Sequence, residues 1–111
     1  MDGDSKTVRT GVLRHVVLFR FRTGATEAGI RHIEEQFRQL PGQIAEVLEF
    51  EWGVDINEES RSQGFTHCFV LTFDSTAARD AYQRHPAHQA FVGILKPDVE
   101  QLLVLDYWAQ I

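Results

Sequence analysis

The chain has 111 residues, with 11 Lys and Arg against 16 Asp and Glu, which gives a formal net charge of −5 at pH 7. This length fits one small domain and excludes a separate cofactor-binding domain. The acidic balance, with no basic concentration beyond three arginines of the first predicted strand, argues against a nucleic-acid partner.

The N-terminal residues and the cysteine content indicate where in the cell the protein is located. Residues 1–11 are polar and without periodicity, so we expect a disordered leader before one folded domain over residues 12–111. The first residues are acidic and no long apolar segment follows them, so we expect a cytoplasmic protein with no membrane contact. The single cysteine, Cys68, excludes an internal disulfide and fits a reducing compartment.

The first half of the chain reads as strand, helix, strand. Leu13 to Arg22 is β-branched and aromatic and alternates in its second half, which predicts a strand. Apolar residues at spacings of three and four predict an amphipathic helix from Thr26 to Leu40, with a stop at Pro41. Alternation then predicts a long strand over residues 44–55.

The second half repeats that order. A dense apolar run, Phe65 to Phe73, predicts a third strand, and Ser75 is a plausible N-cap for a helix through Tyr82. A further helical segment begins near Pro86, because proline suits the first turn of a helix. The last predicted strand covers residues 101–108.

This βαββαβ order predicts an α+β, ferredoxin-like fold, in which a four-stranded antiparallel sheet carries its helices on one face. Apolar residues also occupy the opposite face, where Val16, Leu18, Cys68 and Val70 would lie. No element remains to cover them. We therefore expect a homodimer that packs these open faces together into a barrel-like unit.

Three arginines of the first strand, Arg14, Arg20 and Arg22, alternate onto one face. Pairing with Glu49 and Glu51 on a neighbouring strand is the simpler interpretation. An anion-binding site is the alternative.

Two strand histidines are candidates for chemistry. Alternation places His15 beside Val17 and Phe19, and His67 beside Phe69, so both would face the helices near one end of the same inner layer. A lone histidine there is more often a satisfied core residue than a catalyst. Two together favour a functional site.

The segment Tyr82 to His88 supplies the remaining candidates. Pro86 opens a helix, His85 precedes it as a cap, and His88 falls in its first turn. A helix N-terminus disfavours the imidazolium, so we expect His88 to be neutral and able to accept a proton. Tyr82 ends the preceding helix, and its side chain can fold back over the same helix-facing cavity as His88. The alternative is a helix-entry motif with a core tyrosine.

The sequence gives less support to a metal site or to a nucleophilic cysteine. Pro86 splays His85 and His88 apart, and the sequence has neither a cysteine pair nor a His-Glu-x-x-His motif, so we expect no metal. Cys68 faces away from both strand histidines. Asp106 and Tyr107 occupy opposite faces of the last strand, so at most one joins the cavity.

These motifs resemble the stress-responsive A/B barrel (Dabb) family. The resemblance rests on the opening strand at residues 15–21, the block at 64–73, the run from Tyr82 through His85-Pro86-Ala87-His88, and the closing Asp106-Tyr107-Trp108. It covers residues 13–108, and it implies a dimeric α+β barrel. The His-Pro-Ala-His segment is its most specific part.

The resemblance also implies a site. One plant member of the family is a polyketide cyclase that closes a ring by an intramolecular aldol reaction. Its catalytic tyrosine and histidine would fall on Tyr82 and His88, and its pocket histidines on His15 and His67. We add His85 as a further substrate-binding candidate.

Two hypotheses about function follow. The first is a homodimer that binds a small ligand in a pocket between helices and sheet. The alternative is a cofactor-free, cyclase-like enzyme using the acid–base pair of Tyr82 and His88.

Overall fold

A computed structural model describes residues 11–110, so the expected leader lies outside the described residues except for Gly11. No helix in that part of the chain is long and apolar enough to cross a membrane. In chain order the elements are β1 (Leu13–Phe21), α1 (Glu27–Gln43), β2 (Glu49–Val54), β3 (Phe65–Phe73), α2 (Thr76–Arg84), α3 (Pro86–Leu95) and β4 (Val99–Trp108). The predicted order of elements is confirmed.

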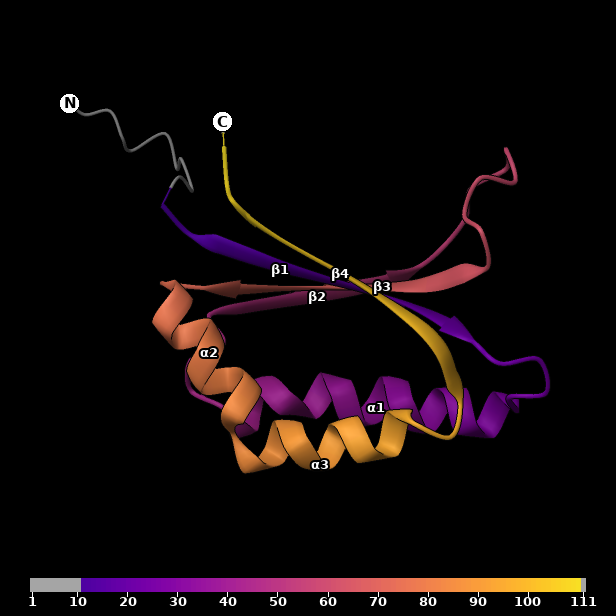
Figure 1. Ribbon diagram of the computed structural model, residues 1–111, viewed down its shortest axis with the longest axis horizontal. Coiled ribbons are helices and arrows are strands. Elements are labelled where there is room, and N and C mark those ends of the chain that lie inside the picture. The colour runs from indigo at the N-terminus through magenta and orange to yellow at the C-terminus, as the bar shows by residue number, and fades with distance from the viewer. Residues whose placement is uncertain (1–10, 111) are drawn as a thin grey trace.

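The four strands form one antiparallel sheet in the order β2-β3-β1-β4. All three helices lie on one side of this sheet, with α1 and α3 side by side and α2 near one end (Figure 1). The ferredoxin-like α+β fold expected from the sequence is therefore the fold of the chain.

Each helix begins at a residue whose side chain accepts a backbone hydrogen bond. The hydroxyl oxygen of Thr26 accepts from the N–H of Gly29 at 3.0 Å, and that of Ser75 accepts from Ala78 at 3.1 Å. His85 caps α3 through Nδ1, which accepts from the N–H of Ala87 at 3.0 Å. These contacts satisfy donors that have no partner within a helix.

Three element boundaries differ from the prediction. α1 continues past Pro41 to Gln43, because a proline in the last turn removes only one intrahelical hydrogen bond. β2 begins at Glu49 rather than at residue 44, because Ile44 and Val47 are buried in the core and do not pair with β3. β4 begins at Val99, two residues early, opposite Phe21.

The core lies between the sheet and the helices, and it is rich in aromatic rings. Phe37 of α1 stacks on Phe69 of β3 with ring centroids 4.2 Å apart, and Phe91 of α3 lies 4.7 Å from Phe37. Phe19 of β1 is fully buried beside them. This packing joins both long helices to the two central strands.

The helices leave β4 uncovered. Register places Leu102 and Val104 opposite Phe19 and Val17, on the helix side of the sheet. Their exposed fractions are nevertheless 47% and 48%, against 0% and 7% for the two β1 residues. An apolar strip on the inner side of β4 therefore remains open beside the core.

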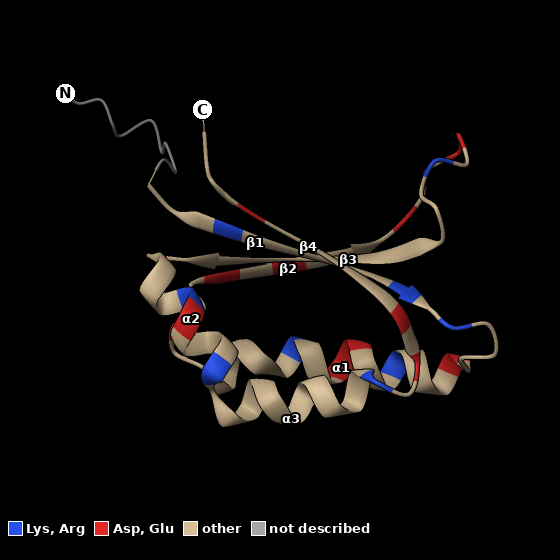
Figure 2. Cartoon of the chain, in the orientation of Figure 1, with Lys and Arg blue, Asp and Glu red and all other residues tan. Residues whose placement is uncertain are grey.

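The opposite face of the sheet carries no helix. Its centre is apolar, formed by Val16, Leu18, Val70, Leu103 and Leu105, of which Leu105 is 60% exposed. The charged residues of β1 lie toward the two ends of that strand, and Glu51 of the edge strand β2 lies opposite Val70 (Figure 2). An apolar patch with a charged rim is typical of an interaction surface.

Candidate active site

The structure brings Tyr82, His15 and His88 together at the α2 end of the helix-facing layer. Tyr82 is 1% exposed and His15 is 4% exposed. The ring centroids of Tyr82 and His88 are 4.6 Å apart, and those of Tyr82 and His15 are 6.0 Å apart. Three of the predicted site residues thus form one cluster.

A hydrogen bond to the backbone fixes the tautomer of His88. Its Nδ1 lies 3.0 Å from the carbonyl oxygen of Gln83, and because a carbonyl only accepts, Nδ1 carries the hydrogen. Its Nε2 is then the unprotonated nitrogen. Burial lowers the pKa of His88, the hydrogen bond to Gln83 opposes that change, and the nearby His15 lowers the pKa further. The expected neutral imidazole is supported, with burial rather than the helix N-terminus as the main cause.

Tyr82 is held as a donor. Burial raises the pKa of its phenol, so the hydroxyl stays protonated throughout the neutral range. Among the described residues, no group forms a hydrogen bond with this hydroxyl. Buried polar groups in proteins are generally hydrogen-bonded, and an unpartnered one is costly. The hydroxyl of Tyr82 is therefore suited to a ligand.

His15 is oriented by a residue of β4. Its Nδ1 lies 2.6 Å from Oδ1 of Asp106, which β1–β4 register places directly opposite. The other carboxylate oxygen of Asp106 accepts from Nη1 of Arg79 at 2.9 Å. Asp106, rather than Tyr107, is thus the β4 residue that joins the cluster. Strand pairing was the signal for Asp106; nothing in the sequence pointed to Arg79.

His67 lies elsewhere, and the expectation that the two strand histidines share one end of the inner layer is wrong. β1 and β3 are antiparallel, so His67 pairs with Phe19, four positions along β1 from His15. At a rise of roughly 3.3 Å per residue the two are about 13 Å apart along the sheet. The four-residue convergence of Tyr82, His88, His15 and His67 does not form.

The contacts of His67 are those of a satisfied core residue. Its Nε2 lies 2.7 Å from Oε2 of Glu34 on α1, and its Nδ1 lies 2.8 Å from the hydroxyl of Thr66. Trp52 stacks on the imidazole with ring centroids 6.0 Å apart. Both ring nitrogens are occupied within the chain, so the side chain links β3 to α1.

His85 has its own structural task. Its Nδ1 accepts the N–H of Ala87 at the start of α3, as the cap interpretation predicted. The side chain is half-buried. The side-chain contact described for His85 is the cap of α3. The structure therefore does not place this side chain in the cluster of Tyr82, His15 and His88.

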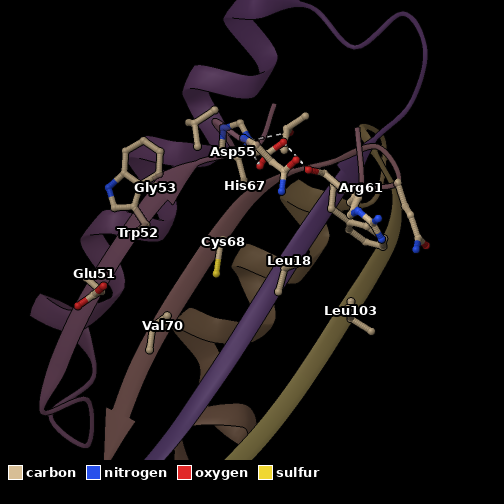
Figure 3. A pocket seen from close by; sticks show the side chains of 16 residues that line it. Leu18, Glu51, Trp52, Gly53, Asp55, Arg61, His67, Cys68, Val70 and Leu103 are labelled. Atoms are coloured by element: carbon tan, nitrogen blue, oxygen red, sulfur yellow. Dashed lines mark hydrogen bonds between the residues drawn. The ribbon is translucent and has the colours of Figure 1, made fainter. Parts of the chain in front are cut away.

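Two hollows lie on the open face of the sheet, on the far side from Tyr82. The first, of about 630 Å³, is bounded by the β2–β3 loop and has Leu18, Cys68, Val70 and Leu103 along its floor (Figure 3). The second is lined by Arg14, Glu49, Phe50, Glu51, Val70, Thr72 and Tyr107. Both belong to the face that the sequence assigned to a second copy.

The three arginines considered as one basic group in the sequence have separate surroundings in the structure. Arg14 pairs with Glu49 at 3.0 Å, as the cross-strand interpretation predicted. Arg20 instead binds the carbonyl of Gln63 at 3.2 Å, and Arg22 lies beyond the end of β1.

Burial, with a smaller effect of Glu51, raises the pKa of the Cys68 thiol, which disfavours the reactive thiolate.

Over residues 11–110 no group of three or more His, Cys, Asp and Glu side chains is placed to hold a metal ion. The cluster around Tyr82 offers imidazole nitrogens and a hydroxyl group instead. This set is suited to moving protons on an organic ligand.

Comparisons with known proteins agree with this fold. The model of the Stress responsive A/B Barrel Domain family matches residues 13–109. The stress-response A/B barrel domain-containing protein HS1 of Arabidopsis thaliana is 35% identical over 97 residues, 87% of this chain and 89% of that protein. Olivetolic acid cyclase of Cannabis sativa is 28% identical, over 86% of this chain and 94% of the cyclase.

Solved structures give the same result. Hydroxynitrile lyase from Passiflora edulis has a TM-score of 0.84 at 28% identity, covering 91% of this chain and 95% of the lyase. A dimeric ferredoxin-like protein of unknown function from Jannaschia sp. CCS1 has a TM-score of 0.77 at 27% identity, covering 89% of this chain and all of that chain.

Proposed function

Since the chain belongs to the stress-responsive A/B barrel (Dabb) family, we propose that it is a homodimeric, cofactor-independent acid–base catalyst that acts on small carbonyl compounds. The observation that carries this proposal is the pairing of a buried, unpartnered phenol with an imidazole held as a free base, 4.6 Å apart between ring centroids.

The geometry supports a division of labour. Nε2 of His88 removes a proton from the carbon next to the carbonyl group, and the C–H electron pair moves to form the enolate. The hydroxyl of Tyr82 donates a hydrogen bond to the oxygen on which the negative charge develops. The enolate carbon then takes the proton back from the His88 imidazolium, or it attacks a second carbonyl of the same molecule. In the second case a C–C bond closes the ring, the C=O electron pair moves to oxygen, and the imidazolium gives its proton to that alkoxide.

Relatives of the chain favour an enzyme. Olivetolic acid cyclase and the hydroxynitrile lyase are both named for a reaction, and both match nearly the whole domain. The name of the stress-response protein HS1 specifies no reaction. Shared fold alone does not transfer an activity, so the argument rests on the cluster of Tyr82, His88 and His15.

The open strip of β4 offers a place for the carbon skeleton of the substrate. Val104 and Leu102 lie on the helix side of β4, two and four residues along that strand from Asp106, the partner of His15. An apolar wall with a few convergent polar groups is the usual composition of a small-molecule site. The substrate would reach the half-buried His88 from this side.

The homodimer rests on the open sheet face. Val16, Leu18 and Val70 lie at its centre, and a second copy of the same face is the cover that the fold itself provides. The dimeric protein from Jannaschia, at 27% identity, supports this assembly.

Deuterium exchange tests the proposed activity. A panel of simple methyl ketones, incubated with the protein in D₂O and followed by proton NMR, should lose signal next to the carbonyl faster than without protein. His88→Ala should slow this exchange by roughly 10²- to 10⁴-fold. The control His32→Ala changes an exposed histidine of α1 and should leave the rate unchanged.

The result also separates the two hypotheses. Saturable binding of ketones that depends on His88 and Tyr82, without exchange in any member of the panel, would reject catalysis and support a small-ligand-binding protein. Exchange that persists in His88→Ala would reject the assignment of the base.

A further inference from the structure

The hydrogen-bonding character of His15 is fixed by residues outside the proposed acid–base pair. One oxygen of Asp106 lies 2.6 Å from Nδ1 of His15, and the other accepts from Arg79 at 2.9 Å. Arg79 is itself held by Asp80, whose Oδ1 accepts from its Nε at 3.1 Å. A carboxylate between two donors only accepts, so Nδ1 of His15 carries the hydrogen.

In the neutral imidazole, this arrangement leaves Nε2 of His15 as an acceptor. The side chain is 5% exposed, and within the described part of the chain no group donates to this nitrogen. A neutral imidazole has one donor and one acceptor nitrogen, and the hydrogen bond at one nitrogen selects the tautomer. Arg79 and Asp106 therefore select the neutral tautomer in which Nε2 of His15 is the acceptor.

Three atoms of the cluster have no hydrogen-bond partner among the described residues, and each requires a different chemical group on a ligand. In the proposed function, Nε2 of His88 faces a C–H bond and the hydroxyl of Tyr82 donates to the carbonyl oxygen. Nε2 of His15 remains, and a buried acceptor is satisfied only by a donor. A plain ketone has no such donor.

We infer that the site takes carbonyl compounds that also carry a hydroxyl group, with the O–H donating to Nε2 of His15. Arg79 and Asp106 are positioning residues for this contact, because they act through His15 and do not touch the substrate. The inference rests on the proposed function for the roles of Tyr82 and His88, and it adds the substrate class.

A matched pair of ligands tests the donor requirement. The probes are 4-hydroxy-2-butanone and 4-methoxy-2-butanone, which differ in that only the hydroxyl group can donate. NMR titration of the wild-type protein should show that the hydroxy compound binds more tightly by about fivefold, the size of one net hydrogen bond.

One substitution should exchange the donor and acceptor nitrogens of the His15 imidazole. In Asp106→Asn the side-chain amide can donate to Nδ1, so the imidazole hydrogen moves to Nε2, which becomes a donor. The hydroxy and methoxy compounds should then bind about equally. The control Asp80→Asn removes the negative charge of a partner of Arg79 without touching His15, and the preference should remain.

Nitrogen-15 NMR of His15 provides a second readout without any ligand. The wild-type protein should show the Nδ1–H tautomer and Asp106→Asn the Nε2–H tautomer, with melting temperature as a check on folding. An Nε2–H tautomer or an imidazolium in the wild type, or an unchanged ligand preference despite a tautomer switch, would overturn the inference. Absence of deuterium exchange would overturn the proposed function alone, because neither readout depends on turnover.

Discussion

Burial acts in opposite chemical directions on the two titratable side chains at the centre of the site. It raises the pKa of the Tyr82 phenol and lowers the pKa of the His88 imidazole. Both groups are therefore uncharged near neutral pH, one as a donor and the other as an acceptor. A neutral pair of this kind transfers protons without first having to pay for a buried charge.

His88 should make the stability of the protein depend on pH. Its pKa is lowered from the ordinary value of 6.5, so below that pH the unfolded chain binds a proton that the folded protein does not. We expect the free energy of unfolding to fall as the pH decreases from 6.5 through the lowered pKa. In His88→Asn, whose amide can still donate to Gln83, the fall should be smaller in denaturant titrations. Parallel pH dependences for the two proteins would contradict this assignment.

Gly64 should tolerate no side chain. Its φ is +85°, and a Cβ there would lie 2.7 Å from Cδ of Arg20. We expect Gly64→Ala to lower the free energy of unfolding by about 1 kcal/mol or more. The control Gly42→Ala has open space around it, and within a helix it should be neutral or slightly stabilising. Chemical denaturation of the two variants checks this, and an equal effect at both glycines would contradict it.

At the scale of the elements, α1 is fastened to the sheet by a polar contact as well as by Phe37. Glu34 accepts from Nε2 of the buried His67, whose other nitrogen is occupied by Thr66. Removal of one partner leaves a buried polar group unsatisfied, which costs more than the hydrogen bond itself. His67 is therefore a structural link in this chain.

Glu34→Ala should destabilise the protein by roughly 1 to 3 kcal/mol, because His67 loses its partner inside the core. Glu35→Ala removes the neighbouring carboxylate, which bonds Arg38 and Gln39 on the surface, and should cost less than about 1 kcal/mol. Thermal unfolding of the two variants gives the comparison. A larger loss in Glu35→Ala would contradict the role assigned to the Glu34–His67 pair.

The elements themselves were largely predictable because local rules determine them. The hydroxyl cap at Ser75 and the proline at the start of α3 both appear where the sequence indicates. The start of β2 was not predictable, since alternation continues through Val47 while tertiary packing turns that residue inward. Propensity and period carry no information about which apolar residues pair and which fill a gap.

The site was predictable only in part, for a related reason. Alternation correctly placed His15 and His67 on the helix side, but their separation depends on the register of two antiparallel strands. Register is a property of the sheet, and the sequence of one strand does not contain it. The same register brings Asp106 opposite His15, so it both removed one expected site residue and added another.

At the scale of the whole molecule, the fold covers one face of its sheet and leaves the other apolar. Leu18 and Val70 line a hollow there, while Leu105 is 60% exposed. A patch of this kind in contact with water is unfavourable, so assembly of two copies would add to stability. The proposed dimer therefore links folding to protein concentration.

Leu18→Asp should break this assembly. A charge placed in the middle of a dry interface without a partner costs several kcal/mol, so we expect sedimentation near the monomer mass of 12.7 kDa, or loss of folding. The wild type should sediment at about twice that mass. The control Ile56→Asp changes a residue that is 90% exposed and should stay dimeric. A wild-type monomer at micromolar concentration would contradict the proposed assembly.

The pH profile of deuterium exchange into a simple methyl ketone tests the acid–base site most directly. If His88 acts as the free base, the rate should rise with pH through a midpoint below 6.5 and then level off, because burial lowers the pKa of this imidazole. Tyr82→Phe should keep the shape of the profile and lower the plateau by about 10²-fold or more. A rate that does not depend on pH between 4.5 and 8, or that rises as the pH falls, would contradict the account.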